Sequence, residues 1–310
     1  MTKKKTILIL GAAGLLGSII SQKLSKSYDI IGFSHKKNQN KNIIKSDYNI
    51  FSSKEDSFLK KADIIINCIG ENSDEAKMKK INMNILKKIA VKINQYKKKK
   101  TFIHISTCGV YGSLADSLIN EETIPKPKTK YSQTKYEGEE ILKHVLKKYT
   151  KLIILRPSQV IGITMKNTSL KKLYNFINKK LFFFVNNKSA IFSYIFADDL
   201  IIVINKLIKL KKHQNITYNV SNKITYERLV KIIQNSLNQK FYYPTINPLF
   251  IKLIIYIFNN ILKIKIPITS KTLHSLMAET TFKSVKIKKD LKITKFININ
   301  SKNLRTLINE

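Results

Sequence analysis

Short apolar runs alternate with helix-like segments through the first half of the chain. The apolar runs lie at residues 6–10, 30–33, 64–66, 102–105 and 152–155. Segments with helical spacing lie between several of them, around 18–26, 79–96 and 132–148. Runs of this length are too short for helices and are typical of parallel strands buried on both faces. The alternation therefore predicts an α/β fold with a doubly wound parallel sheet.

Three glycines, Gly11, Gly14 and Gly17, follow the first apolar run directly. Gly11 can take a tight turn, and the missing side chains at Gly11 and Gly14 let a pyrophosphate reach the backbone. Gly17 lets the next helix pack close to the strand, and the N–H groups and dipole of that helix attract phosphate. The spacing is Gly-x-x-Gly-x-x-Gly, so the sequence predicts a dinucleotide site with a slightly different loop from Gly-x-Gly-x-x-Gly.

The pattern loosens after residue 157. Segments 168–180 and 248–263 have helical spacing, and the tail mixes short strands and helices. We expect a dinucleotide-binding domain over 1–157, with 190–222 returning to its sheet. The rest, 158–310, is expected to be mainly a smaller, mixed α/β substrate-binding region.

The strongly basic composition invites a nucleic-acid interpretation, because the net charge is +37 over 310 residues. However, 54 of the 57 basic residues are lysine, whereas proteins that read bases are expected to use arginine for bidentate contacts. Abundant Lys, Asn and Ile without Trp are typical of AT-biased codon usage. We therefore expect a solvated lysine surface that attracts anionic small molecules and no specific nucleic-acid partner.

Cysteine usage and the apolar segments bear on the compartment. Cys68 and Cys108 follow strands expected to be buried and form no paired framework, which favours a cytoplasmic location. The basic start runs at once into the glycine loop, so no signal peptide is expected. Residues 248–268 come closest to a membrane span, but Lys252 and Lys263 interrupt them. A buried amphipathic helix is favoured there over an interfacial anchor, and no metal site is expected.

Candidate chemistry follows the fourth long strand. Thr107 lies just beyond that strand, where ligands bind in open parallel sheets. Tyr131 and Lys135 are four residues apart and share one face of the next helix. A nearby ammonium favours the phenolate and makes proton transfer by tyrosine feasible. The second such pair, Tyr96 and Lys100, precedes a strand and is interpreted as coincidental.

The whole chain resembles the extended short-chain dehydrogenase/reductase family, in its sugar-nucleotide epimerase, dehydratase and reductase branch. The motifs that carry the resemblance are GAAGLLG, Ser46-Asp47, Asn67-Cys68-Ile69-Gly70, ISTCGVYG, YSQTK, LRPSQVIG, YIFADDL and YNVSN. No single motif is decisive, but their order and spacing are specific. The resemblance implies a Rossmann-type sheet.

The resemblance also implies roles for individual residues. Tyr131 would be the acid/base, Lys135 its electrostatic partner and Thr107 the hydroxyl that orients substrate. The implied cofactor contacts are Gly11, Gly14, Leu15, Leu16, Gly17, Ser34, Lys36, Asp47, Cys68, Ile69, Gly70, Tyr131 and Lys135. The implied substrate contacts are Cys108, Tyr111 and Ser158. Members of the family often pair through two long helices, here 79–96 and 132–148, so a homodimer is an expectation of the resemblance.

Departures from the family pattern narrow the reaction. Dehydratases of the branch carry an Asp-Glu pair where this chain has Cys108 and Gly109, so dehydration is disfavoured. No arginine stands near Phe192, where members that clamp a nucleotide diphosphate often have one. The second strand ends without an acid that would accept the ribose hydroxyls of NAD. Ser34, followed by Lys36, slightly favours NADP over NAD.

Together these features predict an NAD(P)-dependent epimerase or keto-reductase that acts on a nucleotide-linked sugar in surface polysaccharide synthesis. The choice between the two reactions stays open. Two alternatives also remain: a reductase of a non-sugar carbonyl compound, which the missing arginine would suit, and a non-catalytic protein that senses dinucleotides. The Tyr131/Lys135 pair argues against the second.

Overall fold

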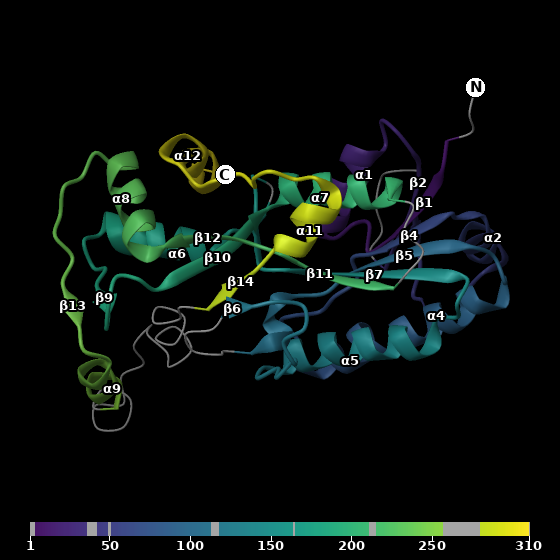
Figure 1. Ribbon diagram of the computed structural model, residues 1–310, viewed down its shortest axis with the longest axis horizontal. Helices are drawn as coiled ribbons and strands as arrows, with labels where there is room; N and C mark the ends of the chain where they lie inside the picture. The colour runs from purple at the N-terminus through teal and green to yellow at the C-terminus, as the bar shows by residue number, and fades with distance from the viewer. Residues whose placement is uncertain are drawn as a thin grey trace.

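A seven-stranded, fully parallel sheet is the centre of the larger part of the molecule (Figure 1). Its strands, in spatial order, are β11 (Ile216–Val220), β7 (Thr150–Pro157), β5 (Lys100–Ile105), β4 (Ile64–Asn67), β1 (Thr6–Leu10), β2 (Asp29–Ser34) and β3 (Ile43–Lys45). The chain runs outward from β1 to β3 and then returns to β4 on the other side of β1. This computed structural model describes residues 4–35, 42–48, 51–112, 118–163, 165–210, 215–256 and 280–309.

Helices cover both faces of the sheet (Figure 1). On one face lie α1 (Leu15–Leu24), α7 (Ala197–Lys209) and α11 (Val285–Leu291). On the other lie α2 (Ser53–Lys61), α4 (Ile85–Gln95) and α5 (Lys130–Val145), with α3 (Glu75–Lys79) and a π-helical turn, η1 (Lys80–Asn84), leading into α4. Successive residues of β1 alternate between the two cores: Ile7 packs into one, and Leu8 packs into the other. The unbroken apolar run of β1 thus reflects burial on both faces.

A smaller region extends from the β7 side of the sheet and holds three short sheets. One contains β12 (Asn222–Thr225), β10 (Ile191–Phe196) and β8 (Gln159–Ile161), another pairs β9 (Phe184–Val185) with β13 (Thr245–Ile246), and the third pairs β6 (Leu118–Ile119) with β14 (Thr281–Phe282). Helices α6 (Thr168–Asn178), α8 (Tyr226–Ser236) and α12 (Ser301–Asn309) share one core with the first two of these sheets. The predicted doubly wound α/β fold with a smaller mixed region is therefore confirmed.

The segment 190–222 returns to the large sheet only in part. Strand β11 pairs with β7, as expected, whereas β10 pairs with β8 and β12 in the small sheet. The edge of β7 is taken by β11, and β8 begins just after the end of β7. Strand β10 therefore aligns with this continuation of the chain and not with β7 itself.

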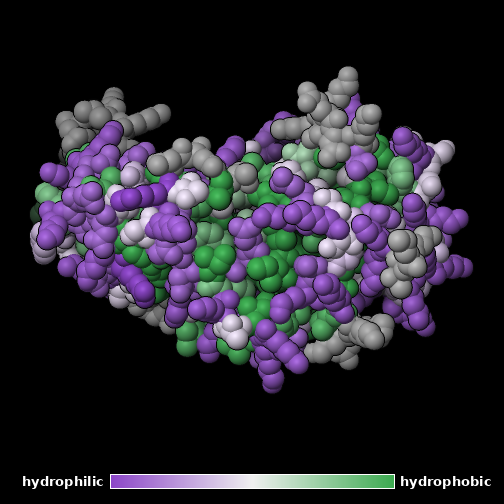
Figure 2. Space-filling view, turned by 90° about the horizontal axis from the view of Figure 1, so that it is seen from above, coloured by the Kyte–Doolittle hydropathy of each residue, from purple (hydrophilic) through white to green (hydrophobic). Residues whose placement is uncertain are grey.

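The apolar segment after residue 247 differs from its predicted burial. Helix α9 (Pro248–Tyr256) buries Ile251 but leaves Leu249, Phe250 and Leu253 exposed. The remainder of the predicted helix lies outside the described residues. No helix in the described ranges is both long enough and apolar enough to cross a membrane. Elsewhere, hydrophilic residues spread over both ends of the face seen in Figure 2, with hydrophobic ones showing between them.

Candidate active site

The turn between β1 and α1 is shaped for close approach of a ligand to the backbone. Gly11 has a positive φ of 78°, which L side chains rarely adopt. A Cβ on Gly17 would lie 2.2 Å from the Gly11 carbonyl oxygen, so only glycine fits there. Gly14 caps α1, and no side chain of the described residues caps this helix end. The N–H groups of Leu15, Leu16 and Gly17 therefore face the turn as an anion site.

Tyr48 links this turn to β2 by hydrogen bonds. Its phenol accepts a hydrogen bond from the Gly11 N–H (3.0 Å) and donates one to the Phe33 carbonyl (2.8 Å). The side chain is buried, and burial raises the pKa of its phenol. Sequence reasoning missed this residue, because a tyrosine after Asp47 carries no recognisable signal. Asp47 itself is exposed, two residues after the end of β3.

The ends of β1, β4 and β5 meet the first two turns of α5. A Cβ on Gly11 would lie 3.0 Å from the Cys68 carbonyl carbon, so the glycine turn abuts the end of β4. The Lys135 ammonium donates to the Ile105 carbonyl at 2.6 Å, directly before the loop that holds Thr107. Residues from four separate segments are thereby gathered at the carboxyl edge of the sheet, where parallel sheets bind ligands.

Lys135 is enclosed by protein, with 3% of its surface exposed. Burial lowers the pKa of its ammonium to about 8, while the carboxylate of Glu139, one turn along α5, acts in the opposite direction. Tyr131 lies one turn before Lys135 on the same helix, and burial raises the pKa of its phenol. Burial therefore favours the protonated form of the Tyr131 phenol and the neutral form of the Lys135 amine.

Thr107 caps the short 3₁₀ turn η2 (Cys108–Tyr111). Its hydroxyl accepts a hydrogen bond from the Gly109 N–H at 3.0 Å, and its side chain is partly exposed. A Cβ on Gly109 would lie 3.6 Å from the Cβ of Ser132, so this turn packs beside the start of α5. Thr107 therefore lies at the same edge as Tyr131 and Lys135.

A buried ion pair lies next to this edge of the sheet, between α5 and β7. Arg156 of β7 donates to Glu139 through Nε (3.0 Å) and Nη2 (2.5 Å), and neither side chain is more than 3% exposed. Ser106 also bonds Glu139, and Arg156 Nη1 donates to the Tyr111 hydroxyl at 2.8 Å. Burial lowers the pKa of the guanidinium, but the bonds and charge of Glu139 outweigh burial and raise it. The network ties α5, β5 and β7 together under the site.

Asn82, in the π-helical turn, is a second residue that sequence reasoning missed. Its amide donates to the Thr134 hydroxyl (3.0 Å) and to the Glu71 carbonyl (3.0 Å), and its oxygen accepts from the Glu71 N–H (2.9 Å). A Cβ on Gly138 would lie 2.6 Å from the Asn82 carbonyl oxygen, so α5 packs tightly against this turn. A π-helical turn often marks a functional site, but its signal is not visible in periodicity.

The three predicted substrate contacts, Cys108, Tyr111 and Ser158, differ in whether their side chains are bonded within the protein. The Cys108 thiol donates to the Arg156 carbonyl at 3.0 Å, and the Tyr111 hydroxyl donates to the Asn219 oxygen at 2.8 Å. Both side chains are buried and turned into the protein. Ser158 is half-buried, and its hydroxyl oxygen has no hydrogen-bond partner among the described residues. That oxygen is itself buried, so among the described residues Ser158 is the one of the three whose side-chain polar atom is left without a protein partner.

The predicted cofactor contacts beyond the glycine turn lie at the ends of β2 and β4. Ser34 is buried at the end of β2, and Lys36 lies outside the described residues. Cys68 and Ile69 are partly exposed after β4, and Gly70 is exposed. Ile69 donates its N–H to the Asn67 side chain at 3.2 Å. Within the described ranges, no cluster of three or more His, Cys, Asp or Glu could hold a metal ion.

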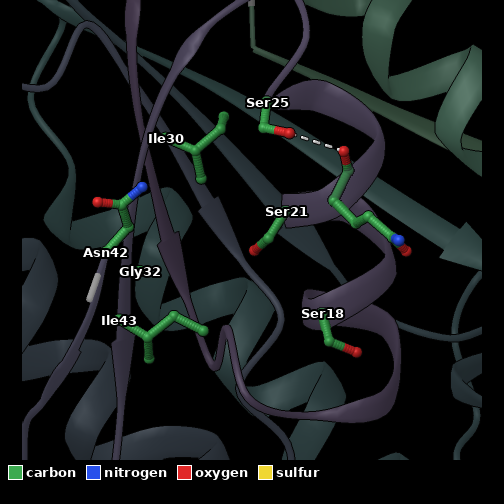
Figure 3. Close-up of a pocket in the computed structure, with 8 residues that line it drawn as sticks. Ser18, Ser21, Ser25, Ile30, Gly32, Asn42 and Ile43 are labelled. Carbon is green, nitrogen blue, oxygen red and sulfur yellow. Dashed lines mark hydrogen bonds between the residues drawn. The ribbon is translucent and has the colours of Figure 1, made fainter. Parts of the chain in front are cut away.

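A cleft of about 430 Å³ lies between α1, β2 and β3 (Figure 3). Ser21 of α1 faces Ile30 and Ile43 across it, and Ser25 donates to the Gln22 carbonyl at 2.8 Å. The cleft contains none of the predicted catalytic residues and extends to Ile30, near the start of β2. It therefore flanks the glycine turn and is separate from the edge where Tyr131 and Lys135 lie.

Comparison with known proteins places this arrangement in a family. The model of the NAD dependent epimerase/dehydratase family matches residues 7–221. The chain belongs to the NAD dependent epimerase/dehydratase family. This confirms the resemblance drawn from the sequence, and it makes the chain a member of a family of NAD-dependent enzymes.

Three individual similarities add detail. A GDP-6-deoxy-D-talose 4-dehydrogenase of Aggregatibacter actinomycetemcomitans is 29% identical over 126 residues, which span 39% of this chain and 41% of that protein. The UDP-glucuronic acid 4-epimerase of Bacillus cereus, solved with NAD, superposes with a TM-score of 0.73 at 17% identity, over 98% of this chain and 95% of that one. The dTDP-4-dehydrorhamnose reductase of Bacillus anthracis, solved with NADP, superposes with a TM-score of 0.61 at 23% identity, over 80% and 86%. The chain thus matches less than half the length of its curated relative, and the two structures support the fold alone.

Proposed function

We propose that this protein is an NAD(P)-dependent oxidoreductase that interconverts a hydroxyl and a ketone on a nucleoside-diphosphate-linked sugar. The product would be an activated sugar of the kind consumed in surface polysaccharide synthesis. The observation that carries the proposal is the convergence of Thr107, Tyr131 and Lys135 beside the glycine turn. A proton donor, a cation and an orienting hydroxyl at one edge of a dinucleotide fold suit carbonyl reduction.

The glycine turn fits a dinucleotide. Because Gly17 has no side chain, α1 packs directly against the Gly11 carbonyl of the turn. The start of α1, which no side chain of the described residues caps, offers its N–H groups to a pyrophosphate. Leu15, Leu16, Cys68, Ile69 and Gly70 line the approach, and Asp47 would hold the adenine. When bound, the nicotinamide supplies or accepts the hydride.

The chain's own residues handle the proton and the orientation of substrate. Tyr131 donates a proton to the sugar oxygen during reduction and removes it during oxidation. The Lys135 ammonium lowers the cost of the phenolate that reduction leaves behind. The Thr107 hydroxyl holds the same sugar oxygen by a hydrogen bond, and Ser158 contributes a second hydroxyl to the substrate side.

Net oxidation or reduction is favoured over epimerisation. The curated relative that is 29% identical over 126 residues is named as a 4-dehydrogenase. In this chain, the end of β2 presents Ser34 and His35 in place of an acid. The absence of an acid there suits a 2′-phosphate, so NADP is slightly preferred to NAD. The similar fold of an NAD-bound 4-epimerase makes epimerisation the second candidate.

The test supplies GDP- and dTDP-linked 4-keto-6-deoxysugars with NADPH or NADH and follows nucleotide oxidation at equilibrium. We expect stoichiometric oxidation of the dinucleotide and a reduced sugar by mass spectrometry. An epimerase would instead retain near-stoichiometric NAD after purification and interconvert UDP-sugars without net oxidation. Turnover of hydrophobic ketones alone would favour the non-sugar alternative, and dinucleotide binding without any turnover would favour a sensor.

A further inference from the structure

Strands β9 and β13 and helix α9 lie at one end of the molecule (Figure 1). Large apolar side chains are exposed on these segments and beside them. On α9, Leu249, Phe250 and Leu253 are 71%, 66% and 53% exposed, and just before β13 Tyr242 is 76% exposed. Globular proteins rarely leave so many large apolar residues in one short stretch without an interaction partner. The family match ends at residue 221, so Tyr242, β13 and α9 lie beyond it.

Two chain segments join to form this surface. Strand β9 pairs with β13 through Phe184 and Thr245, which brings the residues around 181 beside those around 241. Leu181 and Phe241 are also exposed. We call the set the distal surface; its apolar members are Leu181, Phe241, Tyr242, Leu249, Phe250 and Leu253.

Lysines surround these apolar residues. The Lys180 ammonium lies 5.7 Å from the centre of the Phe241 ring, and the Lys188 ammonium lies 5.4 Å from that of Tyr242. Residues 165–190 and 237–256 together contain eight lysines and no Asp or Glu. The acid that faces this surface from α8, Glu227, is paired with Lys231 at 2.9 Å. The distal surface is therefore apolar at its centre and cationic at its rim.

Charge decides between the possible occupants. An isologous contact with a second copy would set lysines against lysines, which is repulsive. Exposed leucines on a short helix contribute nothing to a nucleic-acid contact. An anionic bilayer satisfies both features, because Leu and Phe enter the acyl boundary, Tyr lies at the interface, and lysines extend to lipid phosphates.

We propose that the distal surface docks this protein on a membrane rich in anionic lipid. The membrane would be bound peripherally, with α9 lying in the plane of the headgroups. The proposal does not depend on the catalytic assignment, since none of its residues belongs to the carboxyl edge of the large sheet.

The experiment is flotation of the full chain with vesicles of phosphatidylcholine, with and without phosphatidylglycerol. We expect binding to the anionic vesicles, weakened about tenfold or more in the variant Leu249→Ser/Phe250→Ser/Leu253→Ser. In Lys180→Gln/Lys188→Gln the preference for anionic vesicles should shrink. The matched control is Val91→Ser/Val285→Ser with Lys60→Gln/Lys61→Gln, which removes exposed apolar and basic groups elsewhere and should leave binding unchanged.

Two results would overturn the proposal. Equal loss of binding in the control and test variants, or binding that disappears completely with salt, would mean that overall charge alone adsorbs the protein. A dimer seen by light scattering in the wild type and abolished by the α9 variant would assign the surface to a second copy. Unfolding curves of each variant separate these outcomes from misfolding.

Discussion

The large sheet and the smaller region are held together by different chemistry. The cores that flank the large sheet are built mostly from Ile and Leu, with buried ionic groups at one edge. The core of the smaller region is rich in aromatic residues, with Phe182, Phe184, Phe192, Tyr194 and Tyr226 in edge-to-face or stacked pairs. Parallel strands buried on both faces favour branched aliphatic residues, whereas short strands leave irregular gaps that rings fill.

The two regions also differ in where their charged groups lie. Under the predicted active site, Glu139 and Arg156 are fully desolvated and paired. In the smaller region the charges lie outside, on lysines around exposed apolar side chains. The larger region thus keeps paired, desolvated charges on rigid elements at its predicted active site, whereas the far end of the smaller region exposes apolar and cationic groups to solvent. Substitutions in the two regions should therefore differ in their effects on turnover and on stability.

Tyr131→Phe should have the largest effect, and only on chemistry. Removing the phenol removes the proton donor, so kcat should fall by about 10²–10⁴-fold while dinucleotide affinity stays close to wild type. Turnover and cofactor binding are measured on the same preparation. Tyr194→Phe, in the aromatic core, is the control and should leave kcat unchanged. Unaltered turnover in Tyr131→Phe would remove the tyrosine from the mechanism.

Glu139→Ala should be the most destabilising change at the carboxyl edge. It leaves the Arg156 guanidinium buried without a counter-charge, which costs about 3–5 kcal/mol of unfolding free energy. Replacing both partners, Glu139→Leu with Arg156→Met, should recover most of that loss, because no charge remains buried. Urea unfolding measures both. A loss in the single variant no larger than that of an exposed pair such as Lys231–Glu227 would contradict the buried network.

The pH profile should reflect Lys135. Its pKa is lowered to about 8 by burial, so the ammonium is present below that pH and is lost above it. The kcat/KM for ketone reduction should therefore fall as pH rises through about 8, by about tenfold per unit for loss of one required proton. A profile that stays flat to pH 10 would show that the charge of Lys135 is not needed.

The smallest effects on stability are expected from two substitutions that each remove one tyrosine hydroxyl, and these two should differ in dinucleotide binding. Tyr48→Phe and Tyr194→Phe each remove a buried hydroxyl, the second of which accepts from the Ile299 N–H at 3.1 Å. Each should cost about 1 kcal/mol of stability. Only Tyr48→Phe should also weaken dinucleotide binding, because its phenol positions the glycine turn. Equal cofactor affinities in the two variants would leave Tyr48 with a purely structural role.

The strands of the large sheet were predictable because burial on both faces leaves an unbroken apolar run. Residues 64–66 and 152–155 lie in β4 and β7 as the pattern indicated. The fate of β10 was not predictable: its sequence suits any buried strand, and its partner depends on β11 occupying the edge of β7. The exposure of α9 was also missed, because apolar content predicts burial unless the tertiary contacts are known.

Within the site, the glycine turn could be predicted from the sequence, because the backbone at Gly11 and the close packing at Gly17 both require glycine. The proximity of Thr107 and Lys135 could also be predicted, because in a parallel α/β fold the carboxyl ends of the strands lie at one edge of the sheet. The roles of Glu139, Tyr48 and Asn82 were hidden, because each depends on contacts with residues 15 or more positions away or on a local π-helical turn. Long-range polar pairing leaves no periodic signal.

Transfer of a labelled hydride tests directly whether the protein reduces a sugar ketone with Tyr131 as the proton donor. The nicotinamide carries deuterium at the hydride position, and the nucleotide-sugar product is examined by mass spectrometry and NMR, for wild type and Tyr131→Phe. We predict one deuterium on the former carbonyl carbon with stoichiometric dinucleotide oxidation in the wild type, and almost none in the variant. A wild-type product without deuterium, or equal transfer in both proteins, would contradict the account.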